Sequence, residues 1–129
     1  LLPQVAQAAW NKAAFEAKTM ADLVKALGVS APTESKDVTI TGPDIAENGA
    51  VVPFTISSRV PKTESIALLV EKNPNALAAS FNIPAGTEAG VTTRVKMGQT
   101  SNVTALVKAD GKFYYTTKEV KVTMGGCGG

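Results

Sequence analysis

The C-terminal pentapeptide Gly125-Gly126-Cys127-Gly128-Gly129 holds the single cysteine of the 129-residue chain. Glycine loses more conformational freedom on ordering than any other residue, so we expect this terminal run to form a flexible arm. In the arm only Cys127 has a bulky side chain, and that side chain is a nucleophile once it is ionised. The extended chain from Met124 to Cys127 spans roughly 10 Å, which allows the thiol to enter a narrow pocket of another protein. The pattern therefore predicts thiol chemistry at Cys127.

The rest of the sequence contains no recognisable catalytic or metal-binding group. Histidine is absent and cysteine occurs once, which excludes an internal disulfide, a cysteine-ligated metal site and the usual general base. Ser57 and Ser58 have no histidine to activate them. A cysteine thiol has an ordinary pKa of about 8.5 and is mostly protonated at pH 7, and no residue beside Cys127 lowers that pKa. We therefore predict no cofactor, no metal and no enzyme activity, but a carrier whose thiol is activated by partner enzymes.

The balanced composition excludes two broad classes of binding protein. The formal net charge is +2, aromatic residues make up 5% of the chain and no basic run occurs, so nothing indicates a nucleic-acid surface. No apolar stretch approaches the roughly 18 residues of a membrane-spanning helix. A length of 129 residues is typical of one domain with a single core. We expect one domain that binds neither nucleic acid nor membrane.

The first part of the chain has helical periodicity. Apolar residues recur at helical spacing at Ala6, Trp10, Ala13, Ala14 and Ala17. Thr19 followed by Asp22 resembles a capping box, and Gly28 is a candidate C-terminal cap. We predict a helical segment over residues 1–29 that packs on the domain, followed by a polar linker over residues 30–37.

From residue 38 onward the pattern changes to strands that alternate apolar and polar residues. Seven strands are predicted, at Val38–Thr41, Ala50–Ser58, Ser65–Glu71, Leu77–Ile83, Val91–Met97, Asn102–Ala109 and Lys112–Thr123. Asp110-Gly111 predicts a tight hairpin, and Pro53 within a strand points to an edge or a bulge. Short strands at this spacing predict a mainly β fold, an immunoglobulin-like antiparallel β-sandwich over residues 38–124, with the N-terminal helical segment and the flexible C-terminal arm attached to it.

The last predicted strand is a rigid mount for the arm, because it ends at Met124 where the glycines begin. Lys118 and Lys121 lie close to this junction. Surface lysines usually only solvate an exposed face. The alternative is that they raise the local positive potential near an anionic cargo.

The C-terminal sequence from Val120 to Gly129 resembles the C-terminus of the SoxY family, the sulfur carriers of the bacterial thiosulfate-oxidising Sox system. Further stretches resemble the same family, so the resemblance spans nearly the whole chain. These stretches are Glu47-Asn48-Gly49 followed by Val52-Pro53, then Glu71-Lys72-Asn73-Pro74-Asn75 leading into Phe81, and Arg94-Val95-Lys96-Met97.

The resemblance implies that Cys127 carries thiosulfate as a Cys–S–S–sulfonate adduct, while Gly125, Gly126, Gly128 and Gly129 give the arm its flexibility. It also implies several partner enzymes. A c-type haem enzyme attaches the anionic cargo, a manganese-dependent hydrolase releases sulfate, and a molybdenum–haem sulfane dehydrogenase oxidises the remaining sulfur. The resemblance further implies a SoxZ-like β-sandwich subunit as heterodimer partner and a periplasmic location, reached with an export signal that this chain lacks.

Two other interpretations remain open at the level of the sequence. Some sulfur carriers end in Gly-Gly and use the terminal carboxylate as a thiocarboxylate, and Gly128-Gly129 fits that pattern. Such carriers are usually smaller ubiquitin-like folds and do not need Cys127. The third interpretation is a plain β-sandwich interaction module whose tail only forms intermolecular disulfides.

Overall fold

The computed structural model describes residues 32–74 and 76–124, and this part of the chain is built from strands. The nine strands are β1 (Thr33–Glu34), β2 (Val38–Thr41), β3 (Ile45–Ala46), β4 (Val52–Ser58), β5 (Thr63–Val70), β6 (Leu77–Asn82), β7 (Gly90–Val95), β8 (Ser101–Ala109) and β9 (Lys112–Val122). Within the described residues, no helix is long and apolar enough to cross a membrane. The predicted helical segment over residues 1–29 and the arm over residues 125–129 lie outside this part.

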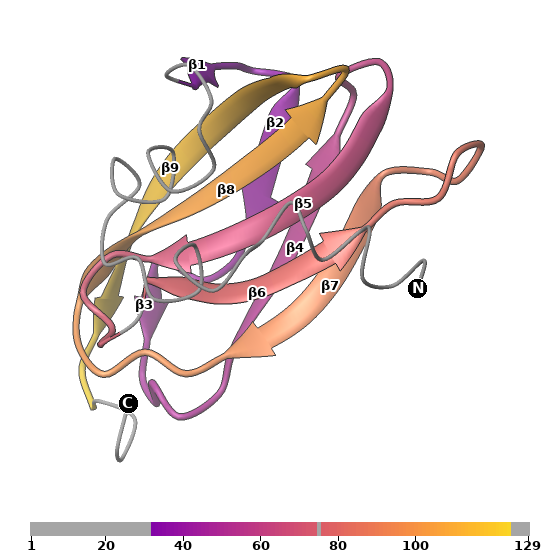
Figure 1. Cartoon of the computed structure of the whole chain (residues 1–129). Helices are drawn as coiled ribbons and strands as arrows, with labels where there is room; N and C mark the ends of the chain where they lie inside the picture. Colours follow the sequence, from indigo (N-terminus) through magenta and orange to yellow (C-terminus); the bar gives the residue numbers. More distant parts are fainter. Residues whose placement is uncertain (1–31, 75, 125–129) are drawn as a thin grey trace.

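The strands form two packed sheets (Figure 1). The larger sheet has the order β1-β9-β8-β5-β6, and β3 pairs with the far end of β9. The smaller sheet has the order β2-β4-β7. All pairings are antiparallel except those of β1 and β3, which run parallel to β9. The mainly β, immunoglobulin-like sandwich predicted from alternation is therefore confirmed.

The core lies between the two sheets and follows from the alternation. Val52, Phe54 and Ile56 of β4 are buried, while the residues between them are exposed. The larger sheet contributes apolar residues of β5, β8 and β9 to the same cluster, namely Ile66, Leu68, Val70, Val103, Ala105, Val107, Ala109 and Val120. Full burial of one such large side chain stabilises the fold by about 1.5–3 kcal/mol, so this cluster fixes how β9 lies on the sandwich.

The other face of the larger sheet is apolar as well. Ala67 and Leu69 of β5 alternate with the core residues of that strand, and Leu106 pairs with Ala67 across the ladder. All three side chains are buried. The sequences of β5 and β8 are therefore nearly continuous apolar runs, since residues on both faces of these strands are buried.

Seven of the nine strands, β2 and β4 to β9, match the predicted strands to within two residues at each end. The Asp110-Gly111 hairpin is confirmed, since both residues have positive φ, at 52° and 77°. Pro53 lies where β4 has a free edge, although β4 as a whole is the central strand of its sheet. The proline is tolerated there because pairing of β2 with β4 begins only at Thr55.

Strands β1 and β3 were not predicted. Each has only two residues, so neither shows alternation in the sequence. Strand β1 falls within residues 30–37, which the sequence analysis assigned to a linker. Both short strands pair with β9 on the edge that faces away from β8.

Candidate functional site

Cys127 and its four flanking glycines lie outside the described residues, so the site is built from the point where they attach. The described chain ends at Met124, just after β9. We call the end of β9 with the segments bonded to it the arm root, which comprises residues 44–51, 97–100 and 121–124. In Figure 1 the arm root lies at the lower end of the sandwich, where β9 and β3 meet.

Strand β3 pairs with the end of β9, on the edge that faces away from β8. The last antiparallel pair joins Ser101 to Val120, and beyond it Lys121 pairs with Ile45 of β3. The backbone N–H of Lys121 donates to the carbonyl of Asp44 at 2.9 Å, and that of Thr123 donates to the carbonyl of Ala46 at 3.1 Å. Strand β9 therefore stays paired almost to the start of the arm.

Gly49 connects the last described residue to the core. Its N–H donates to the carbonyl of Met124 at 2.7 Å, while its own carbonyl accepts the N–H of Met97 at 2.7 Å. Met97 is fully buried. This chain of hydrogen bonds fixes Met124 relative to the core. Asn48 shapes the turn, since its Oδ1 accepts the N–H of Ala50 at 2.9 Å.

Two threonine hydroxyls complete the attachment. The N–H of Val122 donates to Oγ1 of Thr100 at 2.9 Å, which replaces a ladder bond that β8 is too short to supply. Oγ1 of Thr123 donates to the carbonyl of Glu47 at 3.2 Å. When the bonds from β3 and Gly49 are included, every residue from Lys121 to Met124 forms a hydrogen bond through its backbone. The arm root is thus a rigid mount.

The two lysines near the arm root differ in their surroundings. Nζ of Lys118 forms a hydrogen-bonded ion pair with the carboxylate of Asp44, and the Lys118 side chain is only 24% exposed. The hydrogen bond from Lys118 and its positive charge lower the pKa of Asp44 below its ordinary value. The negative charge of Asp44 therefore offsets the positive charge of Lys118. Lys121 is exposed and has no ion pair among the described residues, so of the two it contributes more to the positive potential.

Several residues of the arm root were not predicted from the sequence. Glu47-Asn48-Gly49 was named only among the stretches that resemble the SoxY family, and Asp44, Thr100 and Thr123 were given no role. Their contacts join residues that are far apart in the sequence, such as Val122 with Thr100 and Lys118 with Asp44. The turn signal at Asn48-Gly49 was the one local indication of this arrangement.

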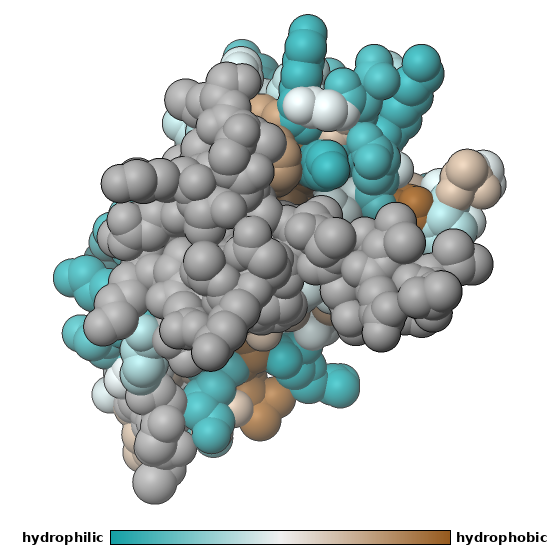
Figure 2. Space-filling model, viewed as in Figure 1, coloured by the Kyte–Doolittle hydropathy of each residue, from teal (hydrophilic) through white to brown (hydrophobic). Residues whose placement is uncertain are grey.

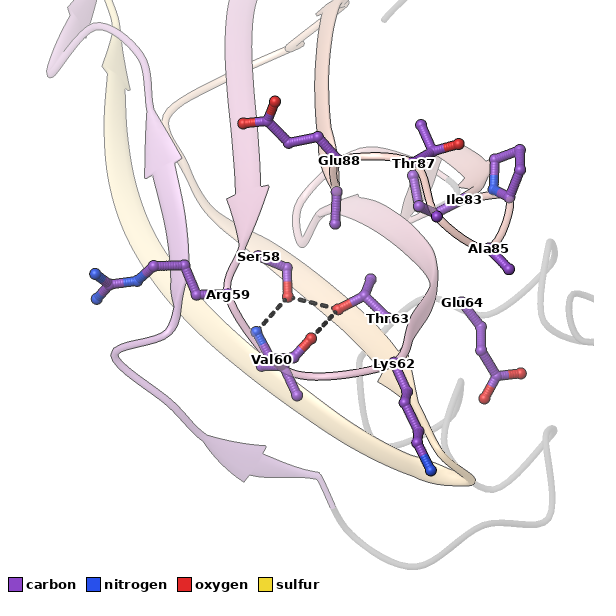
Figure 3. Close-up of a pocket in the computed structure, with 13 residues that line it drawn as sticks. Ser58, Arg59, Val60, Lys62, Thr63, Glu64, Ile83, Ala85, Thr87 and Glu88 are labelled. Atoms are coloured by element: carbon purple, nitrogen blue, oxygen red, sulfur yellow. Dashed lines mark hydrogen bonds between the residues drawn. The ribbon is translucent and has the colours of Figure 1, made fainter.

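A cavity of about 650 Å³ lies at the opposite end of the sandwich (Figure 3). It lies between the β4–β5 and β6–β7 connections, and Thr63 in its wall pairs with Ala109 at the beginning of the β8–β9 hairpin. Charged side chains of both signs line it, namely Arg59, Lys62, Glu64 and Glu88.

The hydroxyl groups in this cavity bond to one another (Figure 3). The N–H of Val60 donates to Oγ of Ser58 at 3.1 Å, and Oγ1 of Thr63 donates to the carbonyl of Val60 at 2.7 Å. The two hydroxyl oxygens are 2.8 Å apart. Because the Thr63 proton is already used, Ser58 must be the donor between them. The two hydroxyl groups therefore bond to each other and to the backbone of Val60, which closes the turn between β4 and β5. No group of three acidic, histidine or cysteine residues in the described part of the chain could hold a metal ion.

Comparisons with known proteins identify the family of this chain. The family model described as sulfur oxidation protein SoxY matches residues 23–127. The solved structure of the sulfur carrier protein SoxY from Chlorobium limicola f thiosulfatophilum is 34% identical, with a TM-score of 0.71, and the match covers 79% of this chain and 93% of that chain. A CARDB domain from Pyrococcus furiosus is 12% identical, with a TM-score of 0.45, over 73% of this chain and 95% of that one. No curated protein matches. On the strength of the family match and the Chlorobium structure, the chain belongs to the SoxY family of sulfur oxidation proteins.

Proposed function

We propose that this protein is a covalent sulfur carrier, which holds thiosulfate-derived intermediates on Cys127 and presents them to partner enzymes during thiosulfate oxidation. The observation that carries the proposal is the match to the SoxY family, which runs through the whole sandwich and ends on Cys127 itself. The Chlorobium relative is described as a sulfur carrier protein. A fixed arm root followed by a glycine-rich arm suits such a role, because the body stays rigid while the thiol reaches out.

The proposed loading step joins thiosulfate to the thiol. The Cys127 thiol and the terminal sulfur of thiosulfate lose two electrons and one proton, and an S–S bond forms between them. The electrons pass to a c-type haem enzyme, which is the oxidant. The product is a Cys–S–S–sulfonate adduct with one negative charge. A covalent bond suits a carrier because the intermediate cannot diffuse away between enzymes.

The proposed second step is hydrolysis by a manganese-dependent partner enzyme. Water supplies the oxygen that turns the terminal sulfonate into sulfate, the bond between the sulfonate and the middle sulfur breaks, and the middle sulfur leaves as a persulfide on Cys127. A sulfane dehydrogenase then oxidises that sulfur. The chain contains no histidine, which is the commonest general base, so these steps are assigned to the partner enzymes.

A SoxZ-like β-sandwich subunit is the proposed heterodimer partner, and the periplasm is the proposed location. Strand β6 forms the edge of the larger sheet, while β2 and β7 form both edges of the smaller one. Edge strands of this kind are surfaces on which a second sheet can pair. The apolar face of the larger sheet, with Ala67, Leu69 and Leu106, supports the further proposal that the segment over residues 1–29 packs there.

Two variants separate the thiol from the terminal carboxylate as the loading group. Cys127→Ser replaces a readily ionised thiol by a hydroxyl that stays protonated at pH 7, so it should abolish loading. Addition of one residue after Gly129 blocks the carboxylate and should leave loading measurable. Both variants are co-expressed with a SoxZ-like subunit, incubated with thiosulfate and the haem enzyme, and examined by intact mass.

Size exclusion of the same samples tests the heterodimer. Co-elution of all three forms of the chain with the SoxZ-like subunit is expected, because the changes lie outside the sandwich. A Cys127→Ser protein that still gains the thiosulfate mass would disprove the role of Cys127 and favour the thiocarboxylate. Elution of the unaltered chain as a monomer beside the second subunit would contradict the heterodimer.

A further inference from the structure

The arm root carries a group of exposed apolar side chains. In residues 32–74 and 76–124, the exposed large hydrophobic residues are Ile45 at 56%, Val51 at 56% and Met124 at 65%. All three belong to the arm root, and none is found at the cavity end. Figure 2 shows a small area of apolar surface at the lower centre of the view. Scattered exposed hydrophobic residues are ordinary, but their concentration at one end requires an explanation.

Backbone hydrogen bonds join the segments that carry these three side chains to the end of β9. Ile45 lies beside Lys121 in the β3–β9 pair, and the next residue, Ala46, is buried. Val51 precedes the buried Val52 in the same alternating way. The segment that joins Ile45 to Val51 passes through Gly49, which is hydrogen-bonded to Met124. Ile45 and Val51 therefore face away from the core on segments whose positions are fixed relative to Met124. We call these three side chains the apolar collar.

The shortness of the arm determines what this collar must meet. Only Gly125 and Gly126 separate Met124 from Cys127. A fully extended chain over this step spans roughly 10 Å, so the reacting atoms of any enzyme that uses Cys127 come within about that distance of Met124. A protein pocket that encloses the thiol is deeper than a single side chain. The rim of the pocket is therefore brought against the collar whenever the thiol is delivered.

Building on the proposed function, we infer that the apolar collar docks against an apolar rim around the mouth of the partner enzyme's active-site channel. Apolar contacts are non-directional, so one collar can meet rims of different shape. Methionine suits this purpose because its unbranched, polarisable side chain adapts to different surfaces. Three side chains form a small contact, which fits a carrier that must leave each enzyme after one turnover.

The test compares a polar collar with a conservative one. The polar variant combines Ile45→Ser, Val51→Ser and Met124→Ser, and the conservative variant combines Ile45→Val, Val51→Ile and Met124→Leu. Each carrier is loaded with thiosulfate to completion, as checked by intact mass, and then used as substrate for the manganese-dependent hydrolase. The polar variant should raise KM on the order of tenfold and leave kcat nearly unchanged, as expected for lost docking contacts. The conservative variant should keep the KM of the unaltered carrier.

Two further measurements keep this inference separate from the proposed function. A small aromatic disulfide reagent should label Cys127 at the same rate in all variants, because this reaction needs no docking. The single change Met124→Ser, at a side chain that is mostly exposed, should leave thermal unfolding unchanged and still raise KM. An unaltered KM for both serine variants would overturn the collar while leaving the carrier role intact. Loading of Cys127→Ser would instead overturn the proposed function.

Discussion

The two ends of the β-sandwich offer different things to a partner molecule. The end with the cavity has a hollow of about 650 Å³ with charged residues of both signs. The end with the arm root has exposed apolar side chains and a chain end held by backbone hydrogen bonds. An enzyme would be expected to use the hollow. A carrier needs no pocket, because the enzyme that acts on its cargo supplies one, so its function depends on how the reactive group is mounted.

Hydroxyl side chains show the same difference between the ends. At the cavity end, Ser58 and Thr63 bond to each other and to Val60 within one turn. At the arm root, Thr100 bonds to the backbone of a residue 22 positions away in the sequence. The first arrangement closes a local turn, whereas the second fixes the end of a strand. Hydroxyl side chains therefore stabilise a turn at the cavity end and the end of a strand at the arm root.

The largest expected effect concerns Gly42, which leads from β2 into the arm root. A Cβ atom at this position would lie 2.6 Å from Cδ1 of Phe54, whose side chain is only 1% exposed. Because the buried ring has little room to move, Gly42→Ala should displace the segment toward β3 and reduce the free energy of unfolding by about 1–3 kcal/mol. Turnover by the partner hydrolase should fall as well. Denaturant unfolding and kcat/KM on the loaded carrier measure the two effects.

Gly90→Ala is the matched control for this change. A Cβ atom at Gly90 would lie 3.9 Å from the carbonyl oxygen of Ile56, which is ordinary contact distance. This variant should unfold and turn over as the unaltered protein does. Equal stability of the Gly42→Ala and Gly90→Ala proteins would show that the segment after β2 is not packed against Phe54 as described.

A matched pair of Thr→Val changes distinguishes the ends more finely. Thr63→Val removes the bonds to Ser58 and to the carbonyl of Val60 in a half-buried turn, so it should cost about 1 kcal/mol of stability and leave turnover unchanged. Thr100→Val frees only the exposed N–H of Val122, which water can satisfy. It should cost less stability but lower kcat/KM a few-fold, because the end of β9 loosens. A reversed pattern, with turnover lost only in Thr63→Val, would place the working surface at the cavity end.

The sequence predicts the long strands well because each has several alternating residues. It could not predict β1 and β3, which form because the edge of β9 that faces away from β8 is free to bond two short segments. The fold class and the antiparallel order of the hairpins are therefore accessible from local pattern. The attachment of short parallel segments depends on which strand edge is left free in the assembled sheet, and alternation does not reveal that.

The residues of the site also differ in how far the sequence could predict them. Thiol chemistry at Cys127 stays a prediction, which the sequence supports because the single cysteine lies among glycines. The apolar collar was not predicted, since hydropathy alone does not distinguish an exposed isoleucine from a buried one. A signal existed at Val51, which is out of phase with the inward residues Val52 and Phe54 and so must face outward. Ile45 had no such signal, because a two-residue strand is too short to show alternation.

The smallest expected effect compares an ion pair at each end. At the arm root, Lys118 holds the carboxylate of Asp44 with a hydrogen bond, whereas at the cavity end Arg59 lies 3.6 Å from Asp37. Exposed pairs contribute little to stability, and salt screens them. Asp44 is 88% exposed, so Asp44→Asn should lower the melting temperature only slightly, and Asp37→Asn should lower it less.

The pH dependence of thermal unfolding shows whether the ion pair of Asp44 stabilises the folded protein. The pKa of Asp44 is lower in the folded protein than in the unfolded chain, where an aspartate has a pKa of about 3.9. A lowered pKa contributes stability that is fully present above the unfolded pKa and is lost as the pH falls through the folded one. The difference in melting temperature between the unaltered protein and Asp44→Asn should therefore be constant near neutral pH, begin to shrink below about pH 4, and vanish once the pH is below the folded pKa. Thermal unfolding across this range measures it. A difference that grew on acidification would mean that Lys118 does not stabilise the charged form of Asp44, and the ion pair would then contribute nothing to holding the arm root.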